Sequence, residues 1–439
     1  MTDLLAARSQ MAMSLAFHII FSVIGIGLPL LMVIAEWRWM RTGDATYLDL
    51  AKRWSKGAAI LFAVGAVSGT VLSFELGLLW PNFMRFAGPI IGMPFSLEGF
   101  AFFTEAIFLG VYLYGWERIG RGAHLFSGVV VALSGVLSGI FVVMANAWMN
   151  APTGFELIDG KAVDVRPFAA MANSAAFSQT LHMTLAAYAA TGLGVAGIHA
   201  TLILRRNTAA FHRYALAIAL AVGAPAAILQ PLSGDISARH VAREQPVKLA
   251  ALEAHFETRR GAPLNIGGWP DVERRETRWA IRIPRGLSFL AFHHPDAEVQ
   301  GLSDFPRDEW PPVAIVHVAF QTMVALGSVL ALVSVAALWR WWRARGIAGV
   351  TSSPLLLRAL AVATPMGFIA IEAGWTVTEV GRQPWIVYGV LRTADAVTPM
   401  PGLVIPFLVF SLLYVLLGVI VVYMLRQHIV RSPARDGAR

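Results

Sequence analysis

The chain has 439 residues, of which 56% are hydrophobic and 14% are charged, whereas a typical soluble domain has about 25% charged residues. This composition excludes a disordered chain, argues against an ordinary cytosolic enzyme, and is typical of a polytopic helical membrane protein. Cysteine is absent, which excludes disulfides, thiolate metal sites and iron–sulfur clusters. The net charge of +8 suits basic cytoplasmic loops, and no Lys/Arg-rich run with interleaved aromatic residues indicates a nucleic-acid partner.

Nine apolar stretches are long enough to cross a bilayer, because each contains close to the roughly 20 residues that a membrane-spanning helix needs. They lie near residues 15–35, 57–79, 97–116, 125–149, 180–204, 214–233, 313–338, 357–378 and 402–425. Tryptophan residues gather at the ends of these stretches, where the aromatic belts of membrane proteins lie. The sequence therefore predicts an all-α, polytopic membrane protein with nine transmembrane helices.

The distribution of basic residues predicts the orientation of these helices. The connections on one side, counted with the C-terminal tail and with Arg358 at the edge of the eighth stretch, carry 18 Lys and Arg. The N-terminus and the short connections on the other side carry 6. The segment 234–312, which carries 11, is left out because long segments cross the membrane largely regardless of charge. Because basic residues favour the cytoplasmic side, we expect an extracytoplasmic N-terminus and a cytoplasmic C-terminus. Residues 1–233 then hold helices 1–6, residues 234–312 an extracytoplasmic loop, and residues 313–439 helices 7–9 with a short cytoplasmic tail.

The loop 234–312 contains 11 basic and 12 acidic residues, which predicts a hydrated segment with only short helices. Within it we expect residues 248–260 to form one amphipathic helix, because Leu249, Leu252 and Phe256 follow helical spacing.

Ionisable residues inside a membrane span are costly, so each is a candidate functional residue. Glu98 and Glu105 lie seven residues apart in the third stretch, which places them on one helix face about 10 Å apart. Such a pair suits proton transfer. The alternative is one interfacial carboxylate and one that is satisfied by a buried partner.

A second carboxylate pair with the same spacing, Glu372 and Glu379, ends the eighth stretch close to Trp375 and Arg382. These residue types can hold a flat anionic cofactor, because arginine pairs with carboxylates and indole packs on a ring face. The alternative is a helix end in the aromatic belt with a Glu379–Arg382 ion pair.

Three further span residues are candidate metal ligands. His18 lies in an apolar run, where histidine acts as hydrogen-bond partner, proton relay or metal ligand, and Arg8 lies near the same membrane face. His182 and Met323 lie at the predicted extracytoplasmic starts of the fifth and seventh stretches. A His and a Met on facing helices form the axial pair of a low-spin haem, although a single Met in so apolar a chain is more often a core residue.

The sequence resembles subunit I of the cytochrome bd-type quinol oxidases, in the branch with a short quinol-binding loop that includes cyanide-insensitive enzymes. The longest match is Glu372-Ala-Gly-Trp375 followed by Glu379-Val-Gly-Arg382-Gln-Pro-Trp385. Further matches are Arg8, His18, Glu98, Glu105, residues 145–150, His182, and residues 234–235 and 248–253. The resemblance extends from about residue 8 to the last span.

The resemblance implies a set of cofactor contacts. His182 and Met323 would be the axial ligands of a low-spin haem b, and His18 and Glu379 would each ligate one of two high-spin haems. Arg8 and Arg382 would pair with haem propionates, and the indole of Trp375 would lie between two haem rings. The cofactors would be two haem b and either haem d or a third haem b.

The resemblance also implies sites for quinol and for protons. Lys248 and Glu253 would belong to the quinol-binding loop. Four residues would carry protons to the oxygen-reducing site: Glu98, Glu105, Asn146 and Ser138. Gln321 departs from the family, because many members carry Arg there, and the loss of that charge near the low-spin haem should lower its reduction potential.

The function implied by the resemblance is the oxidation of quinol and the reduction of dioxygen to water in the bacterial cytoplasmic membrane, which generates a proton gradient without pumping. The expected partner is a second membrane subunit, subunit II, and a small single-span subunit is a further candidate. One alternative is a proton-coupled transporter that uses Glu98, Glu105 and Glu379, against which stands the lack of inverted repeats and of paired broken helices in the sequence. The other is a cytochrome b that relays electrons without oxygen chemistry.

Overall fold

The computed structural model describes residues 1–207 and 209–428. In these residues nine spans are long and apolar enough to cross a membrane, which confirms the predicted fold class. Eight of the spans are single helices and one is a broken pair, α12 and α13. Their bounds are α1 (Asp3–Thr42), α2 (Ala45–Leu79), α3 (Pro81–Tyr114), α4 (Arg121–Asn150), α6 (Ala176–Leu204), α7 (Ala210–Glu244), α10 (Val313–Arg343), α12 (Pro354–Ala363), α13 (Met366–Val380) and α15 (Val404–His428).

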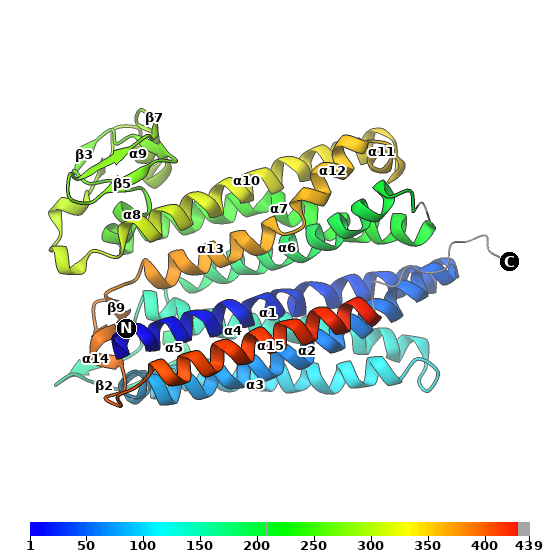
Figure 1. The fold of residues 1–439 in the computed structure, drawn as a ribbon, viewed down its shortest axis with the longest axis horizontal. Coiled ribbons are helices and arrows are strands. Elements are labelled where there is room, and N and C mark those ends of the chain that lie inside the picture. Colours follow the sequence, from blue (N-terminus) through cyan, green and yellow to red (C-terminus); the bar gives the residue numbers. More distant parts are fainter. Residues whose placement is uncertain (208, 429–439) are drawn as a thin grey trace.

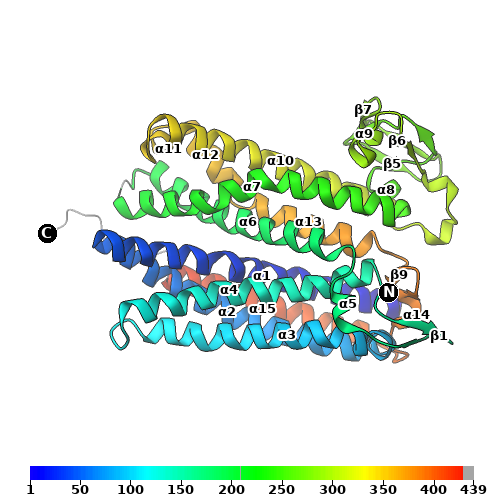
Figure 2. The ribbon, with the colours of Figure 1, turned by 180° about the vertical axis from the view of Figure 1, so that it is seen from behind.

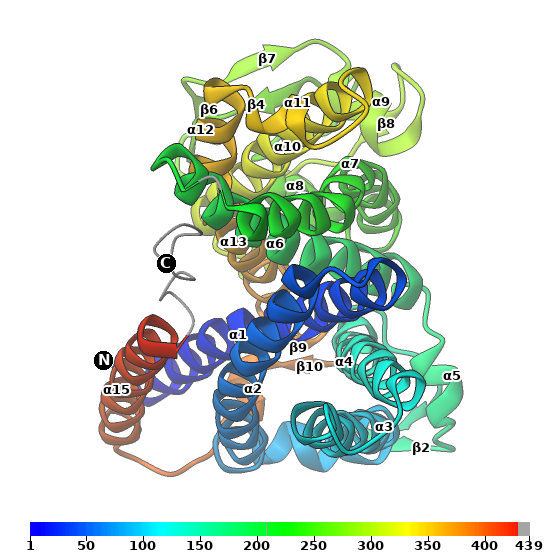
Figure 3. The same ribbon diagram turned by 90° about the vertical axis from the view of Figure 1, so that its right-hand side faces the viewer.

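The long helices run side by side and form two groups, which are seen end-on in Figure 3. One group contains α1, α2, α3, α4 and α15, and the other contains α6, α7, α10, α12 and α13 (Figure 1). Helix α1 joins the groups, because it packs against α2, α4 and α15 on one side and against α6 on the other.

Short elements connect the long helices. Their bounds are β1 (Glu156–Ile158), β2 (Lys161–Val163), α5 (Pro167–Met171), α8 (Pro246–Leu252), β3 (Arg259–Arg260), β4 (Leu264–Ile266), β5 (Trp269–Asp271), β6 (Glu276–Arg278), β7 (Ile281–Ile283), α9 (Gly286–Phe292), β8 (Glu298–Val299), α11 (Ala348–Thr351), β9 (Trp385–Val387), β10 (Leu391–Arg392) and α14 (Thr393–Ala396). The strands pair only as two-stranded antiparallel sheets: β1–β2, β3–β8, β4–β7, β5–β6 and β9–β10, as far as the described residues show.

The segment between α7 and α10 forms a small folded unit, here called the cap, which comprises residues 246–312. It lies at the same end of the helices as the N-terminus, and the connection between α3 and α4 lies at the opposite end (Figures 1 and 2). Helix α7 continues past the predicted end of the sixth stretch at residue 233 to Glu244. The polar residues after 233 therefore begin as helix rather than as loop.

The helix predicted for residues 248–260 is wrong beyond Leu252, where α8 ends. Ala254 adopts a left-handed backbone with φ of 48°, and the His255 N–H donates to the Ala250 carbonyl at 2.8 Å. This is the pattern of a helix C-terminus, in which N–H groups beyond the end satisfy the last carbonyls. Phe256 is nonetheless buried as the pattern predicted, because the chain turns back onto the cap core.

The eighth span is broken at Thr364 and Pro365, between α12 and α13. Proline has no N–H to donate to the carbonyl four residues earlier, and its ring disfavours a helical residue before it. The Thr364 hydroxyl donates to the Ala361 carbonyl at 2.7 Å, and so satisfies the acceptor that the proline leaves free.

Candidate functional site

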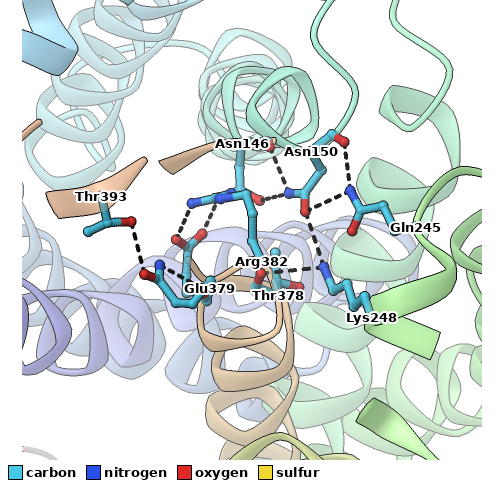
Figure 4. A network of polar contacts seen from close by, with 9 residues as sticks. Asn146, Asn150, Gln245, Lys248, Thr378, Glu379, Arg382 and Thr393 are labelled. Carbon is cyan, nitrogen blue, oxygen red and sulfur yellow. Dashed lines mark hydrogen bonds and ion pairs between the residues drawn. The ribbon is translucent and has the colours of Figure 1, made fainter. Parts of the chain in front are cut away.

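A network of polar side chains joins the end of α13 to the end of α4 (Figure 4). Arg382 Nη2 donates to Glu379 Oε2 at 2.5 Å, and Asn146 Nδ2 donates to Glu379 Oε1. The ion pair weighed as an alternative therefore exists. It leaves room for the cofactor role, because a carboxylate oxygen accepts more than one bond.

Arg382 has the surroundings of a residue that binds an anion. Its side chain is only 2% exposed, and its Nε and Nη1 atoms are buried with no hydrogen-bond partner in the part of the chain that the structure describes. An unsatisfied buried guanidinium is costly, and a propionate would satisfy it. Arg8 on α1 is half-buried and forms no ion pair with any described residue, so its charge is available to an anionic group.

The same network reaches into the cap through Lys248. Lys248 Nζ donates to Asn150 Oδ1 at 3.1 Å and to the Thr378 carbonyl at 3.4 Å, and Gln245 Nε2 donates to the Asn150 carbonyl at 2.6 Å. Asn150 Nδ2 in turn donates to the Asn146 carbonyl at 3.0 Å. Asn150 thus links a residue expected at the quinol site to a residue that holds Glu379 (Figure 4).

Lys248 and Glu253 are both buried in the cap, with 5% and 4% of their surface exposed. Burial, together with the nearby Arg382, lowers the pKa of Lys248 to about 7, and Glu379 opposes the shift. Burial raises the pKa of Glu253 to about 8, and Glu253 Oε2 has no partner within the described residues. Both groups therefore change protonation near neutral pH, which suits groups that accept protons from a substrate.

His182 lies near the start of α6, against α7. Its Nδ1 atom is 2.9 Å from Ser233 Oγ, and its Nε2 atom is 3.1 Å from Gln230 Nε2. A Cβ atom on Gly234 would lie 3.6 Å from the ring, an ordinary van der Waals distance, so α7 passes close beside the ring. A hydrogen bond on one ring nitrogen that orients the other toward a metal is typical of ligating histidines.

Met323 lies on α10, against α13. A Cβ atom on Gly374 would lie 3.1 Å from Met323 Sδ, so the glycine lets α13 pass close to the sulfur. Helices α6, α7, α10 and α13 pack in a ring, since α6 contacts α7, α7 contacts α10, α10 contacts α13, and α13 contacts α6. His182 and Met323 lie on helices that face each other across this ring, as the predicted axial pair requires.

Gln321, at the position where the resemblance predicts an Arg, ties α10 to the cap. The Gly267 N–H donates to Gln321 Oε1 at 3.0 Å, and Gln321 Nε2 donates to the Asn265 carbonyl at 3.0 Å. The neutral amide of Gln321 thus has a hydrogen-bond partner at both its oxygen and its nitrogen. The chain lacks the positive charge that the resemblance predicts two residues before Met323.

His18 lies between α1 and α2. Its Nδ1 atom is 2.9 Å from Ser68 Oγ, its Nε2 atom is 2.9 Å from Ser22 Oγ, and a Cβ atom on Gly69 would lie 3.0 Å from its ring. Both ring nitrogens have hydroxyl partners here, so a haem iron bound at one nitrogen would replace one serine, and the other serine would orient the ring.

Glu98 and Glu105 point from α3 toward α4. Ser138 Oγ donates to Glu98 Oε1 at 3.2 Å, which brings two of the predicted proton carriers together. Glu105 is 6% exposed, and a Cβ atom on Gly135 would lie 3.4 Å from its carboxylate. Asn146, the fourth predicted carrier, lies in the Glu379 network instead.

Trp375 is half-buried on α13, where it packs on the cluster formed by α1 and α6, with Ile19, Ala187 and Ala190 among its neighbours. It therefore lies between the helix group that holds His18 and the one that holds His182. Glu372 Oε1, one turn earlier, is buried without a partner in the described residues.

Sequence reasoning missed three polar residues. Asn150 and Gln245 complete the network around Lys248, and a signal for Asn150 was its place in the matched segment 145–150. Glu75 on α2 is 2% exposed and accepts from Gln10 Nε2 at 3.0 Å and Ser14 Oγ at 2.9 Å. As an ionisable residue inside a span, Glu75 carried the same signal as Glu98.

The nine apolar spans of the described residues, with charged side chains buried between them, define a polytopic integral membrane protein. The profile of the family called cytochrome bd terminal oxidase subunit I matches residues 6–433. The chain belongs to this family, and it is a multi-pass subunit of a quinol-oxidising terminal oxidase of the bacterial inner membrane.

Individual relatives agree with this assignment over the whole chain. The chain is 38% identical over 441 residues to a cytochrome bd menaquinol oxidase subunit I of Bacillus subtilis (strain 168), covering 99% of this chain and 98% of that protein. It is 30% identical to the cytochrome bd ubiquinol oxidase subunit 1 of the same organism, with coverages of 99% and 95%. The bd oxidase structure from Geobacillus thermodenitrificans matches with a TM-score of 0.91 and 39% identity, covering 98% of this chain and 99% of that one.

Proposed function

We propose that the chain oxidises quinol at the cap, between Lys248 and Glu253, and that its membrane helices carry the haems at which dioxygen is reduced. The observation that carries the proposal is the continuous network from Lys248 through Asn150 and Asn146 to Glu379. It places the expected quinol residue within a few hydrogen bonds of an expected haem ligand.

His182 and Met323 would hold a low-spin haem b, and His18 and Glu379 would each hold a high-spin haem, one of them haem b and the other haem d or a third haem b. Arg8 and Arg382 would pair with propionates, which satisfies the unpartnered nitrogens of Arg382. The bound haems supply one-electron transfer and oxygen binding. The protein supplies the ligands, the spacing and the access for protons.

Protons move through the chain's own residues at both ends of this reaction. Lys248 and Glu253 accept the protons that quinol releases, because their pKa values of about 7 and about 8 let each act as a base near neutral pH. Glu98, with Ser138 at its carboxylate, and Glu105 carry protons toward the oxygen-reducing site. Release on the cap side and uptake on the opposite side build a proton gradient without pumping.

The partners follow from the same assignment. The complex contains a second membrane subunit, subunit II, and we propose that a small single-span subunit joins it. The apolar outward faces of α3 and α15, with Phe103 66% and Leu412 72% exposed, are the kind of surface that lipid or another membrane helix covers.

The test is a dithionite-reduced minus oxidised visible spectrum of the purified complex, with a haem extract and an oxygen-uptake assay with quinol. Haem b bands with a far-red chlorin band establish haem d, and haem b bands alone establish the all-b form, each with quinol-dependent oxygen uptake. Haem b bands without oxygen uptake would support the electron-relay alternative. A colourless complex would contradict the proposal and favour a transporter.

A further inference from the structure

A buried polar cluster joins α1, α3 and α4 at the end of the bundle opposite the cap. Glu36 is 0% exposed and His124 is 2% exposed. His124 Nδ1 lies 2.8 Å from Glu36 Oε1, and His124 Nε2 lies 2.9 Å from the Tyr112 carbonyl oxygen. Because both ring nitrogens face oxygen acceptors, only the doubly protonated ring donates to both. The cluster therefore holds a proton that can be passed on.

Two atoms of this cluster have unused hydrogen-bonding capacity. The Tyr112 hydroxyl faces Glu36 and interacts with its carboxylate, and neither that hydroxyl nor Glu36 Oε2 has a further hydrogen-bond partner within the described residues. Buried polar atoms without partners are rare, and bridging water is one way to satisfy them. On the outer side, the Trp116 ring lies 4.0 Å from the His124 ring, and Lys52 Nζ lies 5.4 Å from the Trp116 ring, so the cluster borders the basic surface.

The cluster continues the line of carboxylates on α3. Glu98, Glu105 and Tyr112 are spaced seven residues apart, so they occupy one helix face over about 21 Å. Helix α4 runs antiparallel beside them, and its glycines keep this face open. A Cβ atom on Gly135 would lie 3.4 Å from the Glu105 carboxylate, and one on Gly128 would lie 2.7 Å from the Tyr112 ring.

A small cavity lies beside Glu105, and Leu109, which lines it, stands between Glu105 and Tyr112 on α3. The cavity has a volume of about 10 Å³, and its lining includes Glu105, Leu109, Gly25 and Pro29. This volume is close to the minimum that holds one water molecule. Pro29 has no N–H, so the carbonyl of Gly25, four residues earlier in α1, lacks its helix hydrogen bond. A water here therefore has two polar partners, the Glu105 carboxyl and the Gly25 carbonyl.

We infer that Glu36, His124 and Tyr112 form the proton-uptake site that supplies Glu105 from the predicted cytoplasmic side. This inference rests on the proposed proton role of Glu105 and extends it to the surface. His124 passes its proton to Glu36, and a proton moves from Glu36 through the Tyr112 hydroxyl and water in the cavity to the Glu105 carboxylate. A proton from bulk water then restores the protonated His124. No electron moves in these steps, and each group returns to its starting state.

The test uses the purified complex in vesicles with a pH indicator, and measures proton uptake during one reaction of the reduced enzyme with oxygen. Tyr112→Phe removes only the hydroxyl, and Glu36→Gln removes the ionisable oxygen. We expect each to slow proton uptake at least about tenfold, within the range of proton-transfer groups, with unchanged haem content and unchanged quinol reduction of the low-spin haem. Tyr414→Phe is the matched control, because its hydroxyl is also buried without a partner among the described residues.

Glu105→Gln separates this inference from the proposed function. Slow uptake in Glu105→Gln with native uptake in Tyr112→Phe would overturn the uptake site alone. Native uptake in all three variants would overturn the proton role of Glu105 as well. Reduced thermal stability with native uptake would show that the cluster only clamps three helices. If the complex with Glu36→Gln does not assemble, proton uptake in Tyr112→Phe alone tests the uptake site, since this variant leaves the Glu36–His124 pair intact.

Discussion

At the scale of single residues, the informative positions are polar groups whose bonding is incomplete. Arg382 has two buried nitrogens without partners, and Glu253 has one such oxygen within the described residues. Incomplete bonding in a buried group is costly, so it indicates a ligand that completes it. Arg382 and Glu253 were expected at binding positions from sequence, and this observation supports those predictions independently of the family resemblance.

The pKa values in the cap predict a pH dependence of quinol oxidation. Lys248 accepts a proton only when neutral, above its pKa of about 7, and Glu253 only as a carboxylate, above its pKa of about 8. The rate of haem reduction by quinol should therefore rise with pH between about 6 and 9. Stopped-flow spectroscopy measures this rate.

Two variants assign the steps of that profile. Glu253→Gln should remove the step near its pKa of about 8, and Lys248→Met should remove the step near its pKa of about 7. Reduction by dithionite, which does not use the quinol site, is the control and should show neither change. An unaltered profile in both variants would place the base elsewhere.

The ligand role of His182 is testable by spectroscopy. His182→Ala should abolish the low-spin haem b signal, because an axial ligand is lost. His199→Gln is the matched control: His199 is buried on the same helix, but its Nδ1 atom lies 3.0 Å from His212 Nδ1. We expect that variant to keep the low-spin spectrum. Persistence of the signal in His182→Ala would refute the assignment.

At the scale of elements, glycine contacts set how closely the helices approach. Gly192 on α6 meets Gly223 on α7, and a Cβ atom on Gly192 would lie 2.5 Å from the Gly223 Cα atom. Helix pairs in membranes associate through such close van der Waals packing of small residues. The contact therefore fixes the spacing of the two helices that place His182 and its partners Gln230 and Ser233.

Gly192→Ala should destabilise the complex and loosen the low-spin haem site. An added methyl at 2.5 Å from backbone forces the helices apart, at about 1–3 kcal/mol for overpacking. Gly77→Ala on α2 is the control, because a Cβ atom there meets nothing within 4 Å and alanine favours a helix. Thermal loss of the low-spin haem spectrum measures both. Loss of the low-spin haem spectrum at the same temperature in both variants would contradict the packing argument.

At the scale of the whole molecule, the expected ligands and the cap gather at one end. His18, His182, Met323 and Glu379 lie toward the end of the helices that carries the cap, while the α3–α4 connection and the Glu36 cluster lie at the other (Figures 1 and 2). With the haems and the quinol site at the proposed residues, electrons from quinol would travel a short way, and protons from the opposite side would travel most of the membrane thickness. Such a separation would make the reaction build a membrane potential.

The predicted orientation can be tested because the native chain has no cysteine. Lys161→Cys in the β1–β2 hairpin and Trp279→Cys in the cap place single thiols at exposed positions on the cap side. A membrane-impermeant maleimide should label both in intact spheroplasts. Glu117→Cys, exposed between α3 and α4, should react only after lysis. The reverse pattern would contradict the orientation that the basic residues predict.

The sequence by itself determined the nine spans, the fold class and most of the expected site residues. Apolar length decides whether a segment crosses a membrane, and this is a local property of the chain. His18, Glu98, Glu105 and Glu379 were found because a polar group in an apolar run is visible without any knowledge of its neighbours. The same signal was present at Glu75, and it was not used there.

Only the tertiary structure decided which of these residues meet. It linked Lys248 to Glu379 through Asn150, ended α8 at Leu252 instead of Arg260, and set His124 against Glu36, 88 residues apart in sequence. Such contacts depend on packing between helices and on turns within the cap, which no local pattern of hydrophobicity contains. Helical spacing predicts a face, and the neighbour that covers the face is a long-range property of the fold.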